Sequence, residues 1–317
     1  MSNVAASHEG FSIPLINFSA FLNGTPEERT RTAKEILHGF KTAGFIYLHS
    51  LPLSPSQRQQ VFDASANYFS LSLETKLSHL MPSVESNRGY SANGQEKLGS
   101  EESPDIKETL HIGREKDPKY PNIWPAEIGR LVGFKDTIGG FFDFCTKMVN
   151  EVMRAIAVGL GIDENYFEEY MSDGDHKLRL LHYPEVSTEV FQSNVNKVRA
   201  GAHTDYGAIT LLFQDSRGGL QVKTPTGEYA NATPIENTVV VNAGDLLARW
   251  SNDLIKSTVH RVVEPPLLRK TYCRFFGGPH EDSYIDAIPG TFVTDADKKY
   301  KGVKSGQYYI DRLTATY

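Results

Sequence analysis

Cysteine is scarce in this 317-residue sequence: Cys145 and Cys273 are the only two, and no Cys-x-x-Cys motif occurs. A disulfide scaffold and a thiolate zinc site are therefore excluded. An excess of basic residues is also missing, since 33 lysines and arginines stand against 39 acidic residues and give a net charge of −6. Nucleic acids and anionic membranes bind basic surfaces, so we expect neither to be the partner.

Long apolar segments are absent as well. No run approaches about 18 uninterrupted apolar residues, so we expect no transmembrane helix. The opening residues, MSNVAASHEG, have neither the basic part nor the apolar part of a secretory signal. We therefore expect a cytoplasmic protein, a monomer or weak homo-oligomer, that acts on a small molecule. Ten histidines, with 17 Phe, 15 Tyr and 2 Trp residues, leave room for a metal site in an aromatic pocket.

The first half of the sequence predicts short strands between amphipathic helices. Two apolar runs predict strands: 13–18 and 45–48. Three segments with helical spacing of apolar residues predict helices: 26–43, 55–70 and 130–160. Thr25 and Gly44 are suitable residues for the start and the end of the first helix. Residues 82–127 are rich in Ser, Gly, Asn, Pro and charge, and predict a long loop or lid with one strand near 106–112.

In the second half of the sequence, the apolar residues recur with a period of two. Between Lys177 and Gly277, eight short apolar runs alternate with turn signals, among them LLARWS at 246–251. Gly218-Gly219 and Gly244-Asp245 are interpreted as hairpin turns. This pattern predicts a double-sheet antiparallel jelly roll rather than a Rossmann sheet.

The expected fold is therefore α+β and mainly β. It has a double-stranded β-helix (jelly roll) core with an N-terminal helical region packed around it. Residues 1–126 would form the N-terminal region, and residues 127–317 a helix followed by the catalytic jelly roll, together in one compact unit.

Two histidines and one carboxylate form the first candidate site. Alternate residues of a strand share a face, so His203 and Asp205 can converge on one point. A later strand would bring His260, 57 residues further on, to the same point. This set leaves three positions of an octahedral metal open, which suits ferrous iron that also binds a co-substrate and dioxygen. A second His-x-Asp, starting at His280, has no later histidine to complete it.

A candidate anion site follows nine residues after His260, at Arg269. On a strand, Arg269 and Thr271 would share a face. A guanidinium binds a carboxylate through two hydrogen bonds, and a hydroxyl adds a third. The pair predicts a site for a dicarboxylate co-substrate. Two alternatives from other classes stay open, a zinc hydrolase and a binding module on the same core, although a hydrolase has no use for such a site.

These motifs, together with IPLINF, TAGFIYL, LHYP and NAGDLLARWSN, resemble the isopenicillin-N-synthase-like family of iron(II)/2-oxoglutarate-dependent oxygenases. The resemblance covers nearly the whole chain. Longer runs such as RAGAHTDYG and TLLFQDSRGGLQVK are similar to the thymine 7-hydroxylases of that family. The resemblance implies Fe(II), with 2-oxoglutarate and O2 as co-substrates and ascorbate as a supporting reductant. It also implies release of succinate and carbon dioxide.

Roles for individual residues follow from the resemblance. The iron ligands correspond to His203, Asp205 and His260. The 2-oxoglutarate contacts correspond to Arg269, Thr271 and Tyr183, with threonine where the family has serine. The substrate contacts correspond to Arg179, Tyr206 and Phe275, and Asn87 would line or cover the pocket. Structural explanations stay open for the last group: an ion pair for Arg179, packing for Tyr206 and Phe275, and an exposed turn for Asn87.

The implied reaction is hydroxylation of a methyl C–H bond on a small planar ring, with a thymine-like pyrimidine as the leading substrate. One stretch, YCRFFGGPHEDSY, departs from the aliphatic sequence expected after the clamp, because Arg274 inserts a charge. That departure keeps open a ring from specialised metabolism, methylated aromatic or polyketide-derived, with hydroxylation or ring expansion as the outcome.

Overall fold

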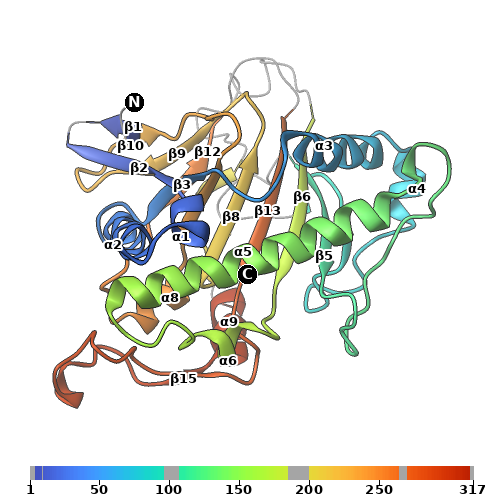
Figure 1. Ribbon diagram of the computed structural model, residues 1–317. Coiled ribbons are helices and arrows are strands. Elements are labelled where there is room, and N and C mark those ends of the chain that lie inside the picture. Colours follow the sequence, from blue (N-terminus) through green and yellow to red (C-terminus); the bar gives the residue numbers. More distant parts are fainter. Residues whose placement is uncertain (1–3, 9, 96–106, 185–199, 264–269, 315–317) are drawn as a thin grey trace.

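The computed structural model describes residues 4–8, 10–95, 107–184, 200–263 and 270–314. Within these residues a nine-stranded sheet packs against a four-stranded sheet (Figure 1). The large sheet has the order β1 (Val4–His8), β2 (Phe11–Asn17), β3 (Phe45–His49), β11 (Val239–Ala243), β8 (Ile209–Gln214), β13 (Lys270–Gly277), β6 (Lys177–Tyr183), β5 (Glu108–Gly113), β4 (Gly89–Ser91). The small sheet has the order β10 (Tyr229–Asn231), β9 (Leu220–Lys223), β12 (His260–Val262), β7 (Ala200–His203). A separate two-stranded sheet pairs β14 (Tyr284–Ile285) with β15 (Val303–Lys304).

Apolar side chains from both sheets fill the space between them. Leu181 and Tyr272 of the large sheet are buried in one cluster with Val222 and Val262 of the small sheet. This double-sheet arrangement confirms the expected jelly roll. Strands β2 to β5, from the predicted N-terminal region, lie in the same sheet as β6, β8, β11 and β13.

The helices are α1 (Ser19–Asn23), α2 (Pro26–Thr42), α3 (Pro55–Phe69), α4 (Leu73–Leu77), α5 (Phe134–Leu160), α6 (Glu168–Met171), α8 (Asp245–Trp250) and α9 (Ser305–Thr314), with 3-10 turns at Gly129–Leu131 and Asp295–Asp297. Of these, α2, α3 and α5 pack against the large sheet. The long helix α5 crosses the sheet (Figure 1), and its Phe142, Cys145 and Val149 are buried in the core. The apolar stripe predicted for 130–160 is therefore core packing. None of the described helices combines the length and apolarity needed to span a bilayer.

Capping explains where the two N-terminal helices begin. The Thr25 hydroxyl accepts a hydrogen bond from the Glu28 amide, and the Glu28 carboxylate accepts one from the Thr25 amide. Ser54 and Gln57 form the same reciprocal pair at the start of α3. Each cap satisfies amides that a helix end leaves without partners, and typically contributes about 1 kcal/mol. The predicted helices at 26–43 and 55–70 are confirmed.

One predicted strand is wrong. Residues 246–251 belong mainly to α8, because Leu246, Leu247 and Trp250 follow helical rather than alternating spacing and all are buried. Gly244 precedes this helix and is not a hairpin turn. Gly218-Gly219 lies in the connection between β8 and β9, with φ angles of 70° and 104°, but it is not a hairpin turn, because β8 belongs to the large sheet and β9 to the small sheet. The predicted loop at 82–127 contains β4 and also β5, close to the strand expected near 106–112.

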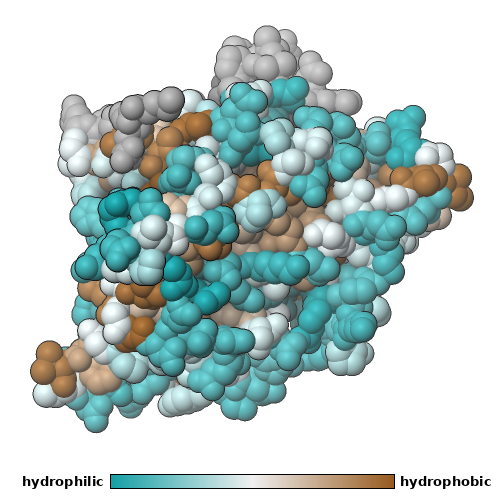
Figure 2. All heavy atoms as spheres, viewed as in Figure 1, coloured by the Kyte–Doolittle hydropathy of each residue, from teal (hydrophilic) through white to brown (hydrophobic). Residues whose placement is uncertain are grey.

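The surface seen from the α5 side is mainly hydrophilic (Figure 2), with hydrophobic residues in separate groups. The exposed apolar side chains include Ile128, Val132 and Val293, which lie on different segments of the chain.

Candidate metal centre and ligand-binding face

Three potential metal ligands meet at the small sheet. His203 ends β7 and His260 begins β12, and the two are direct partners across these strands. Asp205 lies two residues past the end of β7 and is buried. The ligand atoms of the three lie within 4.8 Å of one another, and each histidine Nε2 is 3.8 Å from Asp205 Oδ1. The predicted convergence is confirmed, although Asp205 reaches it from a turn and not from the strand itself.

Hydrogen bonds orient both imidazoles towards this point. His203 Nδ1 donates to the Gly201 carbonyl at 2.7 Å, and His260 Nδ1 donates to the Thr258 carbonyl at 3.2 Å. Protonation of Nδ1 leaves each Nε2 with a free lone pair, as a metal-binding histidine requires.

The carboxylate of Asp205 is oriented in a similar way. Its Oδ2 accepts hydrogen bonds from Thr210 Oγ1 at 2.7 Å and from Asn242 Nδ2 at 2.8 Å. Its Oδ1 faces the two histidines and is available to a cation. Thr210 lies on β8 and Asn242 on β11, so two neighbouring strands of the large sheet fix this ligand.

The charges favour the metal-binding form of all three residues. Burial, together with the neighbouring His260, lowers the pKa of His203 to about 3. Burial also lowers the pKa of His260. Burial raises the pKa of Asp205, but the charges of His260, His203 and Arg274 outweigh it and hold that pKa well below its ordinary value. Two neutral imidazoles and one carboxylate fit a divalent cation such as Fe(II).

The register of β5, β6 and β13 builds a polar row opposite the triad. His111 of β5 pairs with Arg179 of β6, which pairs with Arg274 of β13. Arg274 is 7% exposed, and its charge affects the pKa of all three triad residues. Strand alternation places Arg179 and Arg274 on the face of Leu181 and Tyr272, which points into the jelly roll.

The prediction that Phe275 contacts substrate is wrong. Its ring lies edge-on to Phe142 of α5, with centroids 5.1 Å apart, so it faces the helical layer. A one-residue shift along a strand reverses the face, and Phe276 takes the inward position. The guanidinium carbon of Arg179 lies 5.2 Å from the centroid of the Phe276 ring.

The structure describes some, but not all, of the residues expected to contact 2-oxoglutarate. Arg269 lies outside the described residues, and for Thr271 the backbone alone is described, paired with His182. Tyr183 is fully buried and packs edge-on against Tyr272 at 5.5 Å between ring centroids. The backbone partner of Tyr183 on β13 is Lys270.

Asn87 and Tyr206 have specific contacts. Asn87 has a φ of 47°, and its Oδ1 accepts a hydrogen bond of 2.6 Å from His111 Nδ1. His111 is the backbone partner of Arg179, so Asn87 adjoins the polar row. The Tyr206 ring lies beneath the guanidinium of Arg312, at 4.6 Å from its centroid.

Sequence reasoning missed several residues that shape this site. They are His111, Thr210, Asn242, Arg274 and Phe276. Alternation counted from Tyr183 could have found the last two, had the register between β6 and β13 been known. No local signal marks Thr210 and Asn242, because their role depends on the pairing of β8 with β11.

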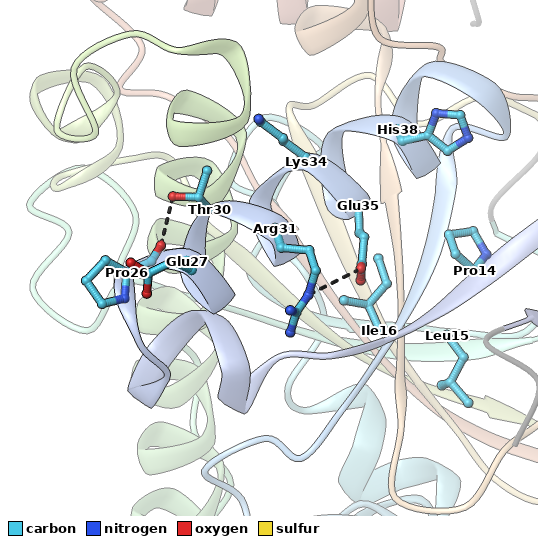
Figure 3. A pocket seen from close by; sticks show the side chains of 10 residues that line it. All are labelled: Pro14, Leu15, Ile16, Pro26, Glu27, Thr30, Arg31, Lys34, Glu35 and His38. Carbon is cyan, nitrogen blue, oxygen red and sulfur yellow. Dashed lines mark hydrogen bonds and ion pairs between the residues drawn. The ribbon is translucent and has the colours of Figure 1, made fainter.

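A separate surface groove has no part in this arrangement. Figure 3 shows it between β2 and α2, with an Arg31–Glu35 ion pair along its wall. Its volume is about 880 Å³. None of the three triad residues lines it.

A jelly roll with two histidines and one carboxylate at one end of its small sheet defines the class of non-haem metal oxygenases. The profile of the 2OG-Fe(II) oxygenase superfamily matches residues 174–278, and the profile described as non-haem dioxygenase in morphine synthesis N-terminal matches residues 13–127. The chain belongs to the 2OG-Fe(II) oxygenases, and it is an enzyme of that family.

Individual relatives agree with this assignment. A proline hydroxylase of Petromyces alliaceus is 33% identical over 318 residues, covering 95% of this chain and 98% of the relative. A 2-oxoglutarate-Fe(II) type oxidoreductase of Metarhizium rileyi is 31% identical over 324 residues, covering 95% and 90%. The structure of the Neurospora crassa thymine 7-hydroxylase with alpha-ketoglutarate and thymine is 56% identical, with a TM-score of 0.94 and coverage of 99% and 100%.

Proposed function

We propose that this oxygenase hydroxylates a methyl C–H bond on a small planar ring, with a thymine-like pyrimidine as the leading candidate. The observation that carries the proposal is the pairing of Arg179 with Phe276 on the face opposite the triad. A flat ring can stack on a phenylalanine while its carbonyl oxygens accept hydrogen bonds from a guanidinium.

His203, Asp205 and His260 are the proposed Fe(II) ligands. Fe(II), 2-oxoglutarate and O2 together supply the oxidising chemistry, with succinate and carbon dioxide as co-products. The protein's own contribution is to hold each ligand atom in place. The carbonyls of Gly201 and Thr258 fix the two imidazoles.

For 2-oxoglutarate, the proposed contacts are Arg269, Thr271 and Tyr183. They rest on the resemblance of the sequence motif alone, because the register of β13 pairs Lys270, and not Thr271, with Tyr183. The burial of Tyr183 between the sheets supports a position where water is excluded. Charge-assisted hydrogen bonds are strongest in such a place.

For the ring, the proposed contacts are Arg179, Phe276, Asn87 and Tyr206. Asn87 bonds to His111, which is the cross-strand neighbour of Arg179, so Asn87 adjoins the proposed ring site. The 56% identity to an enzyme whose structure holds thymine supports a pyrimidine.

A second candidate is the same chemistry on a ring of specialised metabolism. The curated relatives at 31% and 33% identity include a proline hydroxylase, so substrates vary among similar chains. Arg274 distinguishes this chain from the aliphatic sequence expected there.

A succinate-release screen tests the proposal. The protein would be loaded anaerobically with Fe(II) and 2-oxoglutarate, then exposed to O2 with pyrimidines or methylated aromatic acids. We expect ring-dependent succinate release from the native chain and none from Asp205→Ala. Full activity in Asp205→Ala would refute the ligand assignment, and succinate release that no ring stimulates would refute the substrate class.

A further inference from the structure

Arg274 is a buried cation that no side chain in the described part of the protein neutralises. It is 7% exposed, and no described residue forms a hydrogen bond or an ion pair with it. A buried charge is normally paired, because removal from water costs more than an isolated guanidinium can recover. An anion from outside the chain is the simplest acceptor.

The neighbours of Arg274 make a negatively charged partner still more necessary. Its direct partner across β6 and β13 is Arg179, and like charges placed opposite each other on a sheet repel. Its charge lowers the pKa of Asp205, but Oδ2 of that carboxylate already accepts hydrogen bonds from Thr210 and Asn242. A metal at the triad would add further positive charge to the same space.

Counting the charges shows what remains to be balanced. Fe(II) carries two positive charges, Asp205 one negative charge and 2-oxoglutarate two negative charges. Arg269, the proposed 2-oxoglutarate contact, balances the single negative charge that is left, so these groups balance neither the charge of Arg274 nor that of its cross-strand partner Arg179. A neutral ring such as thymine would leave the charge of Arg274 uncompensated in a buried place.

We propose that the substrate is an anion: a planar ring with a carboxylate, which Arg274 binds while Arg179 and Phe276 hold the ring. This deepens the proposed function and rests on it. Arg274 is two residues from Phe276 and opposite Arg179. Tyr183, the proposed 2-oxoglutarate contact, lies four residues after Arg179 on β6, and its cross-strand partner is Lys270. Arg274 therefore adjoins both proposed ring contacts.

The test compares matched acids and neutral rings. The native protein with Fe(II) and 2-oxoglutarate, kept anaerobic, would be titrated with 5-methylorotate against thymine, and with p-toluate against p-toluamide. Calorimetry would give each dissociation constant. We expect each acid to bind at least about tenfold more tightly than its neutral partner, since a bidentate charge-assisted pair forms only with the acid.

Variants of Arg274 then isolate its charge. Arg274→Met should bring the acid-to-neutral ratio within about twofold of one, and Arg274→Lys, which keeps a charge but not the fork, should retain part of it. Arg31→Met removes an arginine from the distant groove of Figure 3 and should leave the ratio unchanged. Circular dichroism would verify that each variant is folded.

Three results would count against this assignment or its foundation. Equal binding of the acids and neutral rings by the native protein would overturn it. So would Arg274→Met raising the dissociation constant of 2-oxoglutarate tenfold while the acid-to-neutral ratio stays the same, because the bound carboxylate would then be that of the co-substrate. Failure of the proposed function has a different signature: neither the acids nor the neutral rings would bind to the native protein, and no ring would stimulate succinate release.

Discussion

Arg312 of the C-terminal helix α9 forms an ion pair with Asp245 of α8, and the same Asp245 carboxylate oxygen accepts a hydrogen bond from Thr204 at 2.9 Å. Thr204 lies between the two ligands His203 and Asp205. The backbone amide of Asp245 also donates to the Asp205 carbonyl at 2.8 Å. The C-terminal helix is thus connected to the metal-binding turn through one side chain.

Removing this connection should weaken binding of the ring substrate more than binding of 2-oxoglutarate. Arg312→Met deletes the ion pair and the cation over the Tyr206 ring. We expect the dissociation constant of the ring substrate to rise about five- to tenfold. The lost cation–π contact accounts for about 0.5–1 kcal/mol of this change, and the lost ion pair adds to it. Titration of ring and 2-oxoglutarate separately measures this. Arg249→Met removes a similar contact over Tyr300 and is the matched control; equal effects from both variants would contradict a specific role for Arg312.

The side chains behind Asp205 should control metal affinity. Asn242→Leu removes one of the two donors to Oδ2 and frees the carboxylate to rotate. Outer hydrogen bonds of this kind are typically worth about 10- to 100-fold in metal affinity. We expect the Fe(II) dissociation constant to rise by that factor, measured by equilibrium dialysis under nitrogen. Thr291→Val, which loses a hydroxyl bond to the Ile288 carbonyl elsewhere, should leave it unchanged. An unaltered constant in Asn242→Leu would show that the metal does not depend on this hydrogen bond.

The sequence predicts the ligand set well because its chemistry is local. His203 and Asp205 are two residues apart, and His260 lies in a short run with strand character, so residue type and spacing carry most of the information. The jelly roll follows from period-two runs for the same reason. The structure of segment 246–251 was harder to predict, because LLARWS fits either a short strand or one and a half turns of helix. Its packing against the turn that contains Asp205 favours the helix α8.

Properties that depend on register could not be predicted in this way. Phe275 and Phe276 are adjacent in sequence and equally apolar, and their faces depend on the pairing of β13 with β6 and β8. The same pairing places Arg274 opposite Arg179. A charge that appears as an irregularity in the sequence becomes part of a polar row once the strands are aligned.

The two phenylalanines provide a direct comparison. Phe276→Ala should weaken ring binding by about tenfold and change stability little, because this ring is partly exposed on the inner face. Phe275→Ala should lower the free energy of unfolding by about 3 kcal/mol or more, because it leaves a cavity against Phe142. Urea unfolding and ring titration on both variants would decide the matter. Loss of ring binding in Phe275→Ala alone, with stability preserved, would reverse the assignment of the two faces.

A buried ionic cluster should make stability depend on pH. Glu108 accepts hydrogen bonds from Lys76 and His182, both at 2.7 Å, and from the Tyr90 hydroxyl. Burial raises the pKa of Glu108, but these three hydrogen bonds outweigh it, and the net pKa lies below the ordinary value of 4.5. A carboxylate with a lowered pKa stabilises the fold above its unfolded value and loses that contribution as the pH falls through the folded one.

Glu108→Gln should therefore destabilise the protein at neutral pH and much less in acid. At pH 7 we expect a loss of about 3 kcal/mol, because Lys76 is left as a buried charge without its counter-ion. The difference from the native protein should shrink as the pH falls below 4.5, where Glu108 itself becomes protonated. Urea unfolding at several pH values measures both effects. Asp282→Asn breaks an exposed pair with Lys304 and should cost less than about 0.5 kcal/mol at every pH. A constant difference between the native protein and Glu108→Gln across this range would show that the carboxylate charge does not stabilise the cluster.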